Sequence, residues 1–195
     1  FAKILTYFTL VSSFIFLSAS LFMKYAVQIP LPGGNILIPE KFWSGLGIIP
    51  IIIGGYFFNG IYLNISAGFL IEKETKYLPL AFGIGAAANI ILNIIFVPIY
   101  GFWASAWATL AAYFIAAVIL YINSRKIYPI EYEWKKVGTI ILLSFLALSL
   151  VNGISSGLSE FMDILTRILI MLGVYVVLII SGVISKSDLK GIIRF

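Results

Sequence analysis

Residues 77–124, YLPLAFGIGAAANIILNIIFVPIYGFWASAWATLAAYFIAAVILYINS, decide the fold because they contain no charged side chain. A helix needs about 20 apolar residues to cross the hydrocarbon core of a bilayer, so this stretch is too long for one crossing and long enough for two. The sequence Val97-Pro98-Ile99-Tyr100-Gly101 interrupts it. Proline lacks an amide hydrogen and glycine lets the chain reverse, so we expect the first helix to end at residue 97. The stretch predicts a transmembrane hairpin with helices over 78–97 and 102–123.

The overall composition indicates an integral membrane protein. Hydrophobic residues make up 62% of the chain and charged residues 11%, whereas globular domains contain about 25% charged residues. The sequence contains no cysteine and no histidine, which excludes disulfides, histidine-based catalysis and cysteine or histidine zinc sites. It also contains no phosphate-binding loop and no nucleophile–base arrangement. We therefore expect no enzyme activity, no catalytic residues, no cofactor and no metal.

Four further apolar segments complete an all-α polytopic bundle of six transmembrane helices. They lie at about 4–23, 44–70, 137–152 and 162–184. The first segment is longer than the apolar part of a signal peptide, which favours a membrane helix. Residues 28–42 contain three prolines and two glycines, so we expect an irregular external loop with at most a short strand or one helical turn.

The basic residues predict the orientation, since short cytoplasmic loops are enriched in lysine and arginine. With a cytoplasmic N-terminus, the basic residues on the other side would be Lys24, Lys41 and Arg167. The ten on the cytoplasmic side would be Lys3, Lys73, Lys76, Arg125, Lys126, Lys135, Lys136, Lys186, Lys190 and Arg194. We therefore expect both ends of this chain to be cytoplasmic. The net charge of +5 is then explained by these basic residues at the membrane surface, and it indicates no nucleic-acid partner.

Uncharged polar side chains lie deep in two predicted helices. The candidates for a substrate cavity are Tyr56, Asn59, Tyr62 and Asn64 in segment 44–70, and Asn89 and Asn93 in segment 78–97. They could line a water-accessible cavity that binds sugar hydroxyls and phosphate oxygens. Alternatively, asparagines bond between helices and stabilise their packing by about 0.6–2 kcal/mol each. We expect Asn59 and Asn89 to share one membrane depth, because each lies about 11 residues, or ~16 Å, from the loop near 71–77.

Two other features are interpreted as structural. Ala104, Ala108 and Ala112 recur every four residues, so we expect them to form a helix-packing face. Asp163 precedes Arg167 by four residues near the start of segment 162–184, and we interpret this as a surface ion pair whose arginine extends to the membrane surface.

Several blocks between residues 43 and 134 resemble one transporter family. The blocks are Trp43–Pro50, Gly60–Asn64, Lys76–Tyr77, Gly83–Asn93, Ile95–Gly101, Ala106–Thr109 and Tyr128–Tyr132, and the run from Asn89 to Thr109 is the most specific. They resemble the polysaccharide biosynthesis flippases, which are oligosaccharide-lipid exporters of the O-antigen type. That family belongs to the superfamily that also includes the multidrug and toxic compound extrusion proteins.

The resemblance implies a two-lobed transporter of fourteen helices, of which this chain would be the C-terminal part. Residues 1–124 would be four helices at the end of the second lobe, and residues 125–195 a cytoplasmic loop, two further helices and a cytoplasmic tail. The N-terminal lobe, absent from this chain, would be a partner, together with membrane lipid. Family members often carry charged residues in the central cavity, and this sequence has none at depth.

The implied function is transport of undecaprenyl-pyrophosphate-linked oligosaccharide across the bacterial inner membrane, for lipopolysaccharide and other surface polysaccharides. Two lobes would rock about a central site by alternating access. One alternative is a multidrug or cation antiporter of the same superfamily, which would need an ion-coupling carboxylate. Another is a structural membrane domain that transports nothing.

Overall fold

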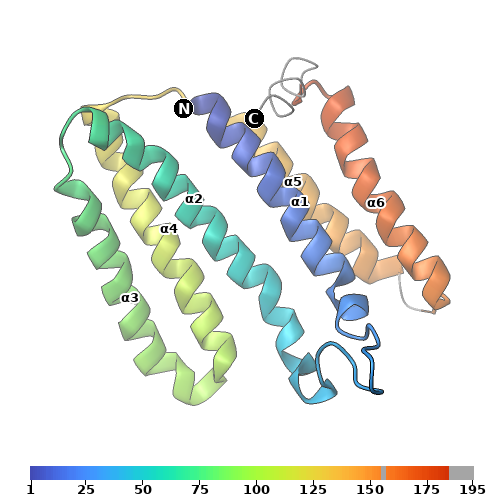
Figure 1. Ribbon diagram of the computed structural model, residues 1–195. Helices are drawn as coiled ribbons and strands as arrows, with labels where there is room; N and C mark the ends of the chain where they lie inside the picture. The colour runs from blue at the N-terminus through green and yellow to red at the C-terminus, as the bar shows by residue number, and fades with distance from the viewer. Residues whose placement is uncertain (155–156, 185–195) are drawn as a thin grey trace. The chain divides into compact units, whose positions relative to one another are not determined.

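The computed structural model describes residues 1–154 and 157–184, and within them the chain is helical without strands (Figure 1). Six α-helices are long and apolar enough to cross a membrane, so the predicted multi-pass helix bundle is confirmed. The elements are α1 (Ala2–Ala26), the 3₁₀-helix η1 (Glu40–Ile48), α2 (Ile49–Ile71), α3 (Tyr77–Tyr100), α4 (Phe102–Ile127), α5 (Trp134–Ile154) and α6 (Glu160–Ile180). The predicted tail at 185–195, and part of the predicted turn at 155–157, fall outside the described residues. The side of the membrane on which the termini lie stays a prediction.

The α3–α4 hairpin is present, but the expectation that Pro98 ends its first helix is wrong. Helix α3 continues through Pro98 to Tyr100. A proline removes one backbone hydrogen bond, and here that loss falls in the last turn, where the helix is about to end anyway. Gly101 makes the reversal alone, with φ at +57° and its amide bonded to the Val97 carbonyl at 2.8 Å. Helix α4 begins at the next residue.

The loop between α1 and α2 is irregular over residues 28–39, as predicted. It contains one isolated antiparallel bridge, between Pro30 and Ile36, and no helix before Glu40. The chain then forms η1, so the predicted helix start near residue 44 is a 3₁₀-helix that passes into α2 at Ile49. The indole nitrogen of Trp43 donates to the Ile38 carbonyl at 2.9 Å and ties the loop to η1.

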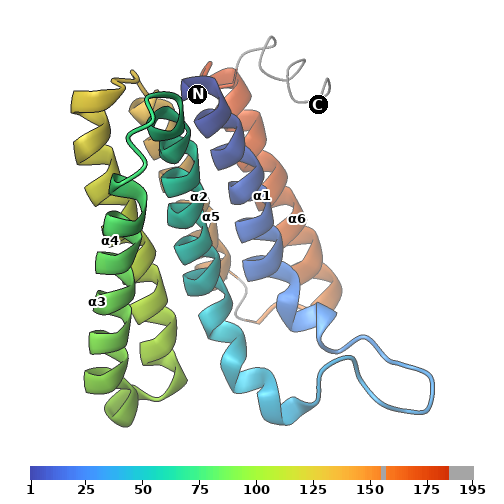
Figure 2. The same cartoon turned by 60° about the vertical axis from the view of Figure 1, so that its left-hand side comes forward.

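The described chain divides into two compact units, of which the first comprises residues 1–8 and 47–132. In this unit α4 lies beside both α2 and α3 (Figures 1 and 2). The predicted alanine face is confirmed, because Ala104, Ala108 and Ala112 are all buried. A methyl group added at Gly85 of α3 would lie 2.6 Å from the Ala112 carbonyl oxygen. One added at Gly55 of α2 would lie 3.3 Å from the Cα atom of Leu110.

The second unit comprises residues 9–46 and the described residues from 133 onward. It contains most of α1, the loop with η1, and helices α5 and α6. Phe16 of α1 packs against Phe145 of α5, with ring centroids 5.4 Å apart. Ser13 of α1 hydrogen-bonds the Tyr175 hydroxyl of α6 at 3.2 Å. The expected boundary after residue 124 concerns transporter lobes and stays a prediction.

Candidate functional site: a polar stripe on helices α2, α3 and α4

A ladder of uncharged side chains joins α3 to α4. The Ser105 hydroxyl donates to the Asn93 side-chain oxygen at 2.6 Å, and the Asn93 amide donates to the Asn89 side-chain oxygen at 3.1 Å. The Asn89 amide lies 3.5 Å from the Thr109 hydroxyl, which itself donates to the Ser105 carbonyl at 2.9 Å. The ladder places Asn93 of α3 level with Ser105 of α4. Two of its bonds, from Ser105 to Asn93 and between Asn89 and Thr109, join the two helices, as in the alternative in which asparagines hold helices together.

The ladder continues toward α2 through a third residue of α4. Ser105, Thr109 and Tyr113 are four apart, so they follow one line along that helix. The ring of Tyr113 lies 5.9 Å from the ring of Tyr56 on α2. Asn59 follows Tyr56 by three residues and therefore lies on the same side of α2. We call this set the polar stripe: Tyr56, Asn59, Asn89, Asn93, Ser105, Thr109 and Tyr113.

The polar stripe is open rather than buried. Every member keeps part of its surface exposed, and Tyr56 is 59% exposed. Tyr56 and Asn59 lie near the middle of α2, which runs from residue 49 to residue 71. In hydrocarbon, an amide or hydroxyl without a hydrogen-bond partner costs several kcal/mol. The ladder already pairs Asn89 and Asn93 with α4, so this cost falls on Tyr56 and Asn59, whose side chains make no hydrogen bond in the described structure. Their part of the stripe is therefore suited to contact with water, a polar ligand or another polar protein surface, and poorly suited to lipid.

Helix α3 carries a face of the opposite character. Ile90, Ile91, Ile94 and Ile95 are all exposed, and Ile94 is 70% exposed. Their spacing places them together on one side of the helix. An aliphatic surface without polar atoms matches the hydrocarbon of a bilayer, so we expect this to be the lipid-facing side of α3.

The six residues predicted to line a cavity fall into two groups. Tyr56, Asn59, Asn89 and Asn93 belong to the polar stripe, whereas Tyr62 and Asn64 lie elsewhere on α2. Tyr62 is buried and donates to the Leu78 carbonyl at 2.9 Å, which ties α2 to the start of α3. The side-chain oxygen of Asn64 is buried without a hydrogen-bond partner in the described structure.

Asn64 lies between two glycines that allow close packing. Gly60 and Gly68 flank it at intervals of four residues, so the three share one side of α2. Side chains pack directly over both glycines, Phe8 over Gly60 and Tyr128 over Gly68. This side of α2 is therefore a packing surface, and its expected role in a cavity stays untested.

Asn59 and Asn89 lie about one helical turn apart in depth. Gly55 packs on Leu110, and Asn59 follows Gly55 by four residues, so Asn59 is level with about Phe114, four residues after Leu110 on α4. Gly85 packs between Ala112 and Ala116, and Asn89 follows Gly85 by four residues. Because α3 is antiparallel to α4 in the hairpin, Asn89 is level with about Leu110, four residues before the midpoint of Ala112 and Ala116. The offset is about four residues, or ~6 Å, which is less than two helical turns. The predicted common depth holds to that extent.

The interpretation of Asp163 and Arg167 as a surface pair is wrong. The two residues are 4% and 7% exposed, and the arginine Nε donates to the carboxylate at 2.9 Å. The same carboxylate accepts from Lys24 at 2.5 Å and from the Tyr25 hydroxyl, both on α1. The guanidinium also donates to the Leu21 carbonyl of α1 at 2.9 Å. The i, i+4 spacing identified the pair, but its burial depends on contacts with α1 from a distant part of the sequence.

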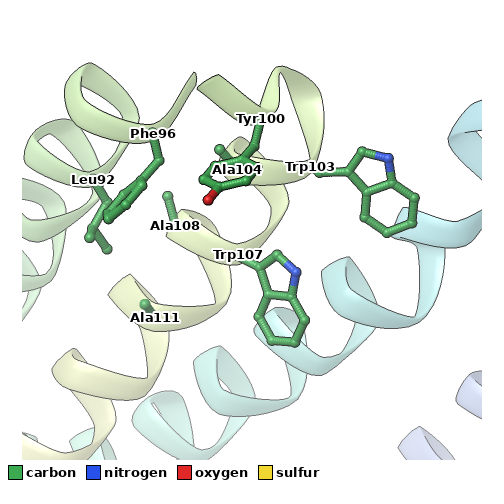
Figure 3. Close-up of a pocket in the computed structure, with 8 residues that line it drawn as sticks. All are labelled: Leu92, Phe96, Tyr100, Trp103, Ala104, Trp107, Ala108 and Ala111. Atoms are coloured by element: carbon green, nitrogen blue, oxygen red, sulfur yellow. The ribbon is translucent and has the colours of Figure 1, made fainter. Parts of the chain in front are cut away.

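An apolar pocket of about 520 Å³ lies at the Gly101 end of the α3–α4 hairpin (Figure 3). Aromatic and aliphatic side chains surround small alanines on α4 in this view. The lining residues are Leu92, Phe96, Tyr100, Trp103, Ala104, Trp107, Ala108 and Ala111. The pocket shares no lining residue with the polar stripe, so the hairpin carries a polar region and a separate apolar hollow.

No protein-family model, curated protein or solved structure matches this chain. The function must therefore be argued from the helices, their faces and the chemistry of the polar stripe.

Proposed function

We propose that the chain is the C-terminal part of a membrane exporter that moves lipid-linked oligosaccharide from the cytoplasmic to the outer leaflet. The observation that supports it best is the polar stripe, which is uncharged and partly exposed and which includes Tyr56 and Asn59 near the middle of α2. Sugar hydroxyls both donate and accept hydrogen bonds, as do amides and phenolic hydroxyls. A neutral polar surface can therefore bind a glycan weakly enough to release it on the other side.

The mechanism would be alternating access, with no bond made or broken. Substrate sites in such transporters lie near the bilayer midplane, between two halves that rock against each other. Here the lipid-facing side of α3 would stay in the bilayer while the polar stripe faces the cavity. The resemblance to O-antigen flippases supports a pyrophosphate-linked glycan on an undecaprenyl carrier in the bacterial inner membrane.

The multidrug or cation antiporter draws less support from the charged residues. Among the acids that the structure describes, Asp163 alone is buried. Its two oxygens accept from Lys24, Tyr25 and Arg167. A carboxylate held by two cations and a phenol is poorly placed to bind a transported cation or exchange a proton, because its negative charge is already compensated.

The test is glycan export in cells carrying Asn59→Leu and Asn89→Leu in the intact protein. We expect the double variant to reduce transfer of lipid-linked sugar to the surface while its amount in the membrane is unchanged. Ile94→Leu, on the lipid-facing side of α3, is the matched control and should export normally. Normal export by the double variant would leave both asparagines as packing residues and would contradict the proposal.

A further inference from the structure

Residues 27–38 form a short antiparallel hairpin at the end of α1 (Figure 2). The Leu31 amide donates to the Asn35 carbonyl at 2.7 Å, and the Leu37 amide donates to the Ile29 carbonyl at 3.0 Å. Gly33 and Gly34 make the turn with φ angles of +96° and +81°, which other residues rarely adopt. These bonds and the glycine turn give residues 27–38 a defined backbone conformation.

One face of this hairpin is aliphatic and exposed. Side chains alternate between the faces of an extended strand, so Ile29, Leu31 and Leu37 point to the same side. Each is between 41% and 52% exposed. Ile36 and Ile38, on the other side, are less exposed. The hairpin therefore presents its most exposed aliphatic side chains together.

The position and charge of the hairpin indicate what covers this face. The hairpin joins the end of a membrane helix to η1, which leads directly into another membrane helix. No charged residue occurs between Lys24 and Glu40, and Lys41 stands just outside the segment, whereas Lys24 is paired with Asp163. Segments that lie in the membrane interface combine an apolar face with flanking basic residues that contact lipid phosphates.

We propose that the apolar face of residues 27–38 inserts into the interfacial layer of the bilayer and anchors the α1–α2 connection to lipid. The partner is the lipid surface of the same membrane that the helices cross. The aliphatic contact of the hairpin with lipid would therefore continue the contact that the helices make with lipid. Trp43 supports this position, since its indole is bonded to the hairpin at Ile38 and tryptophan favours the interface. The inference does not depend on the proposed transport function.

Single cysteines can test this directly, because the chain contains none of its own. Leu31→Cys and Leu37→Cys would each carry a nitrobenzoxadiazole fluorophore, in the whole chain reconstituted into phosphatidylcholine vesicles. Gln28→Cys, exposed at the start of the hairpin on the other face, is the matched control. Quenching by lipid with a shallow spin label is compared with quenching by aqueous iodide.

We expect the labels at 31 and 37 to be quenched by the lipid probe, to lie within about 10 Å of the headgroup boundary, and to be shielded from iodide. The label at 28 should show the reverse. Equal iodide quenching at all three positions would place the hairpin in water and overturn the proposal. Shielding from both quenchers would mean that protein covers the face, with pyrene excimers at residue 31 identifying a second copy, and would equally overturn it.

Discussion

Replacing Gly85 by alanine should weaken the contact between α3 and α4. The added methyl group would lie 2.6 Å from the Ala112 carbonyl oxygen and 3.2 Å from the Ala116 methyl. The carbonyl belongs to the backbone and cannot rotate away, so the helices must separate. Such overpacking costs about 1–3 kcal/mol.

The matched control is Gly83→Ala on the same helix, where the added methyl group meets nothing within 4 Å. Alanine favours a helix over glycine by up to about 1 kcal/mol, and this gain applies to both variants. Gly83→Ala should therefore be neutral or slightly stabilising, and Gly85→Ala should unfold about 1–3 kcal/mol more easily than Gly83→Ala. Unfolding by sodium dodecyl sulfate in mixed micelles, followed by circular dichroism, gives both free energies. Equal values for the two variants would refute the close approach at Gly85.

Three further predictions concern the polar groups. Asp163→Ala should destabilise by about 3–5 kcal/mol in the same assay, because it leaves Arg167 buried without its carboxylate. Lys24→Ala should cost clearly less, since Lys24 is half-exposed, and equal losses would contradict the buried cluster. Asn93→Leu should cost about 0.6–2 kcal/mol through its lost bonds to α4, and no measurable loss would mean that the ladder contributes nothing. Burial raises the pKa of Tyr132 from 10.0 to about 12. The folded protein thus favours the neutral phenol, so the contribution of Tyr132 to the free energy of unfolding is present below pH 10 and is lost as the pH rises from 10 to 12. Tyr132→Phe should make the fall in the free energy of unfolding over this range shallower, and an unchanged fall would rule out a contribution from this phenol.

The helices were predictable because hydrophobic length is a property of the sequence alone. Six segments were long enough to cross a bilayer, and the structure contains a helix at each. Pro98 misled the prediction, since the sequence shows a missing amide but not that the helix would end within the same turn. The position of Gly101 was the better signal, because only its positive φ reverses the chain.

The polar stripe could be predicted only in part. Four of its members were identified because an asparagine or tyrosine in the middle of a membrane helix is conspicuous. Ser105, Thr109 and Tyr113 were missed, although their spacing of four residues was a usable signal. Which asparagine bonds to which hydroxyl depends on how α3 and α4 are aligned, and that register is set by small residues such as Gly85. Asp163 and Arg167 were misplaced because their partners on α1 are more than 130 positions away in the sequence.

The most direct test of the cavity is the reactivity of Asn59→Cys toward a charged, water-soluble thiol reagent, in the intact protein in its membrane. Ile94→Cys, on the exposed aliphatic side of α3, is the control. If the polar stripe faces an aqueous cavity, Asn59→Cys should react readily, and Ile94→Cys should stay unmodified because thiols in hydrocarbon meet neither water nor the reagent. An unreactive Asn59→Cys, or an Ile94→Cys that reacts as fast, would contradict the assignment of the two faces.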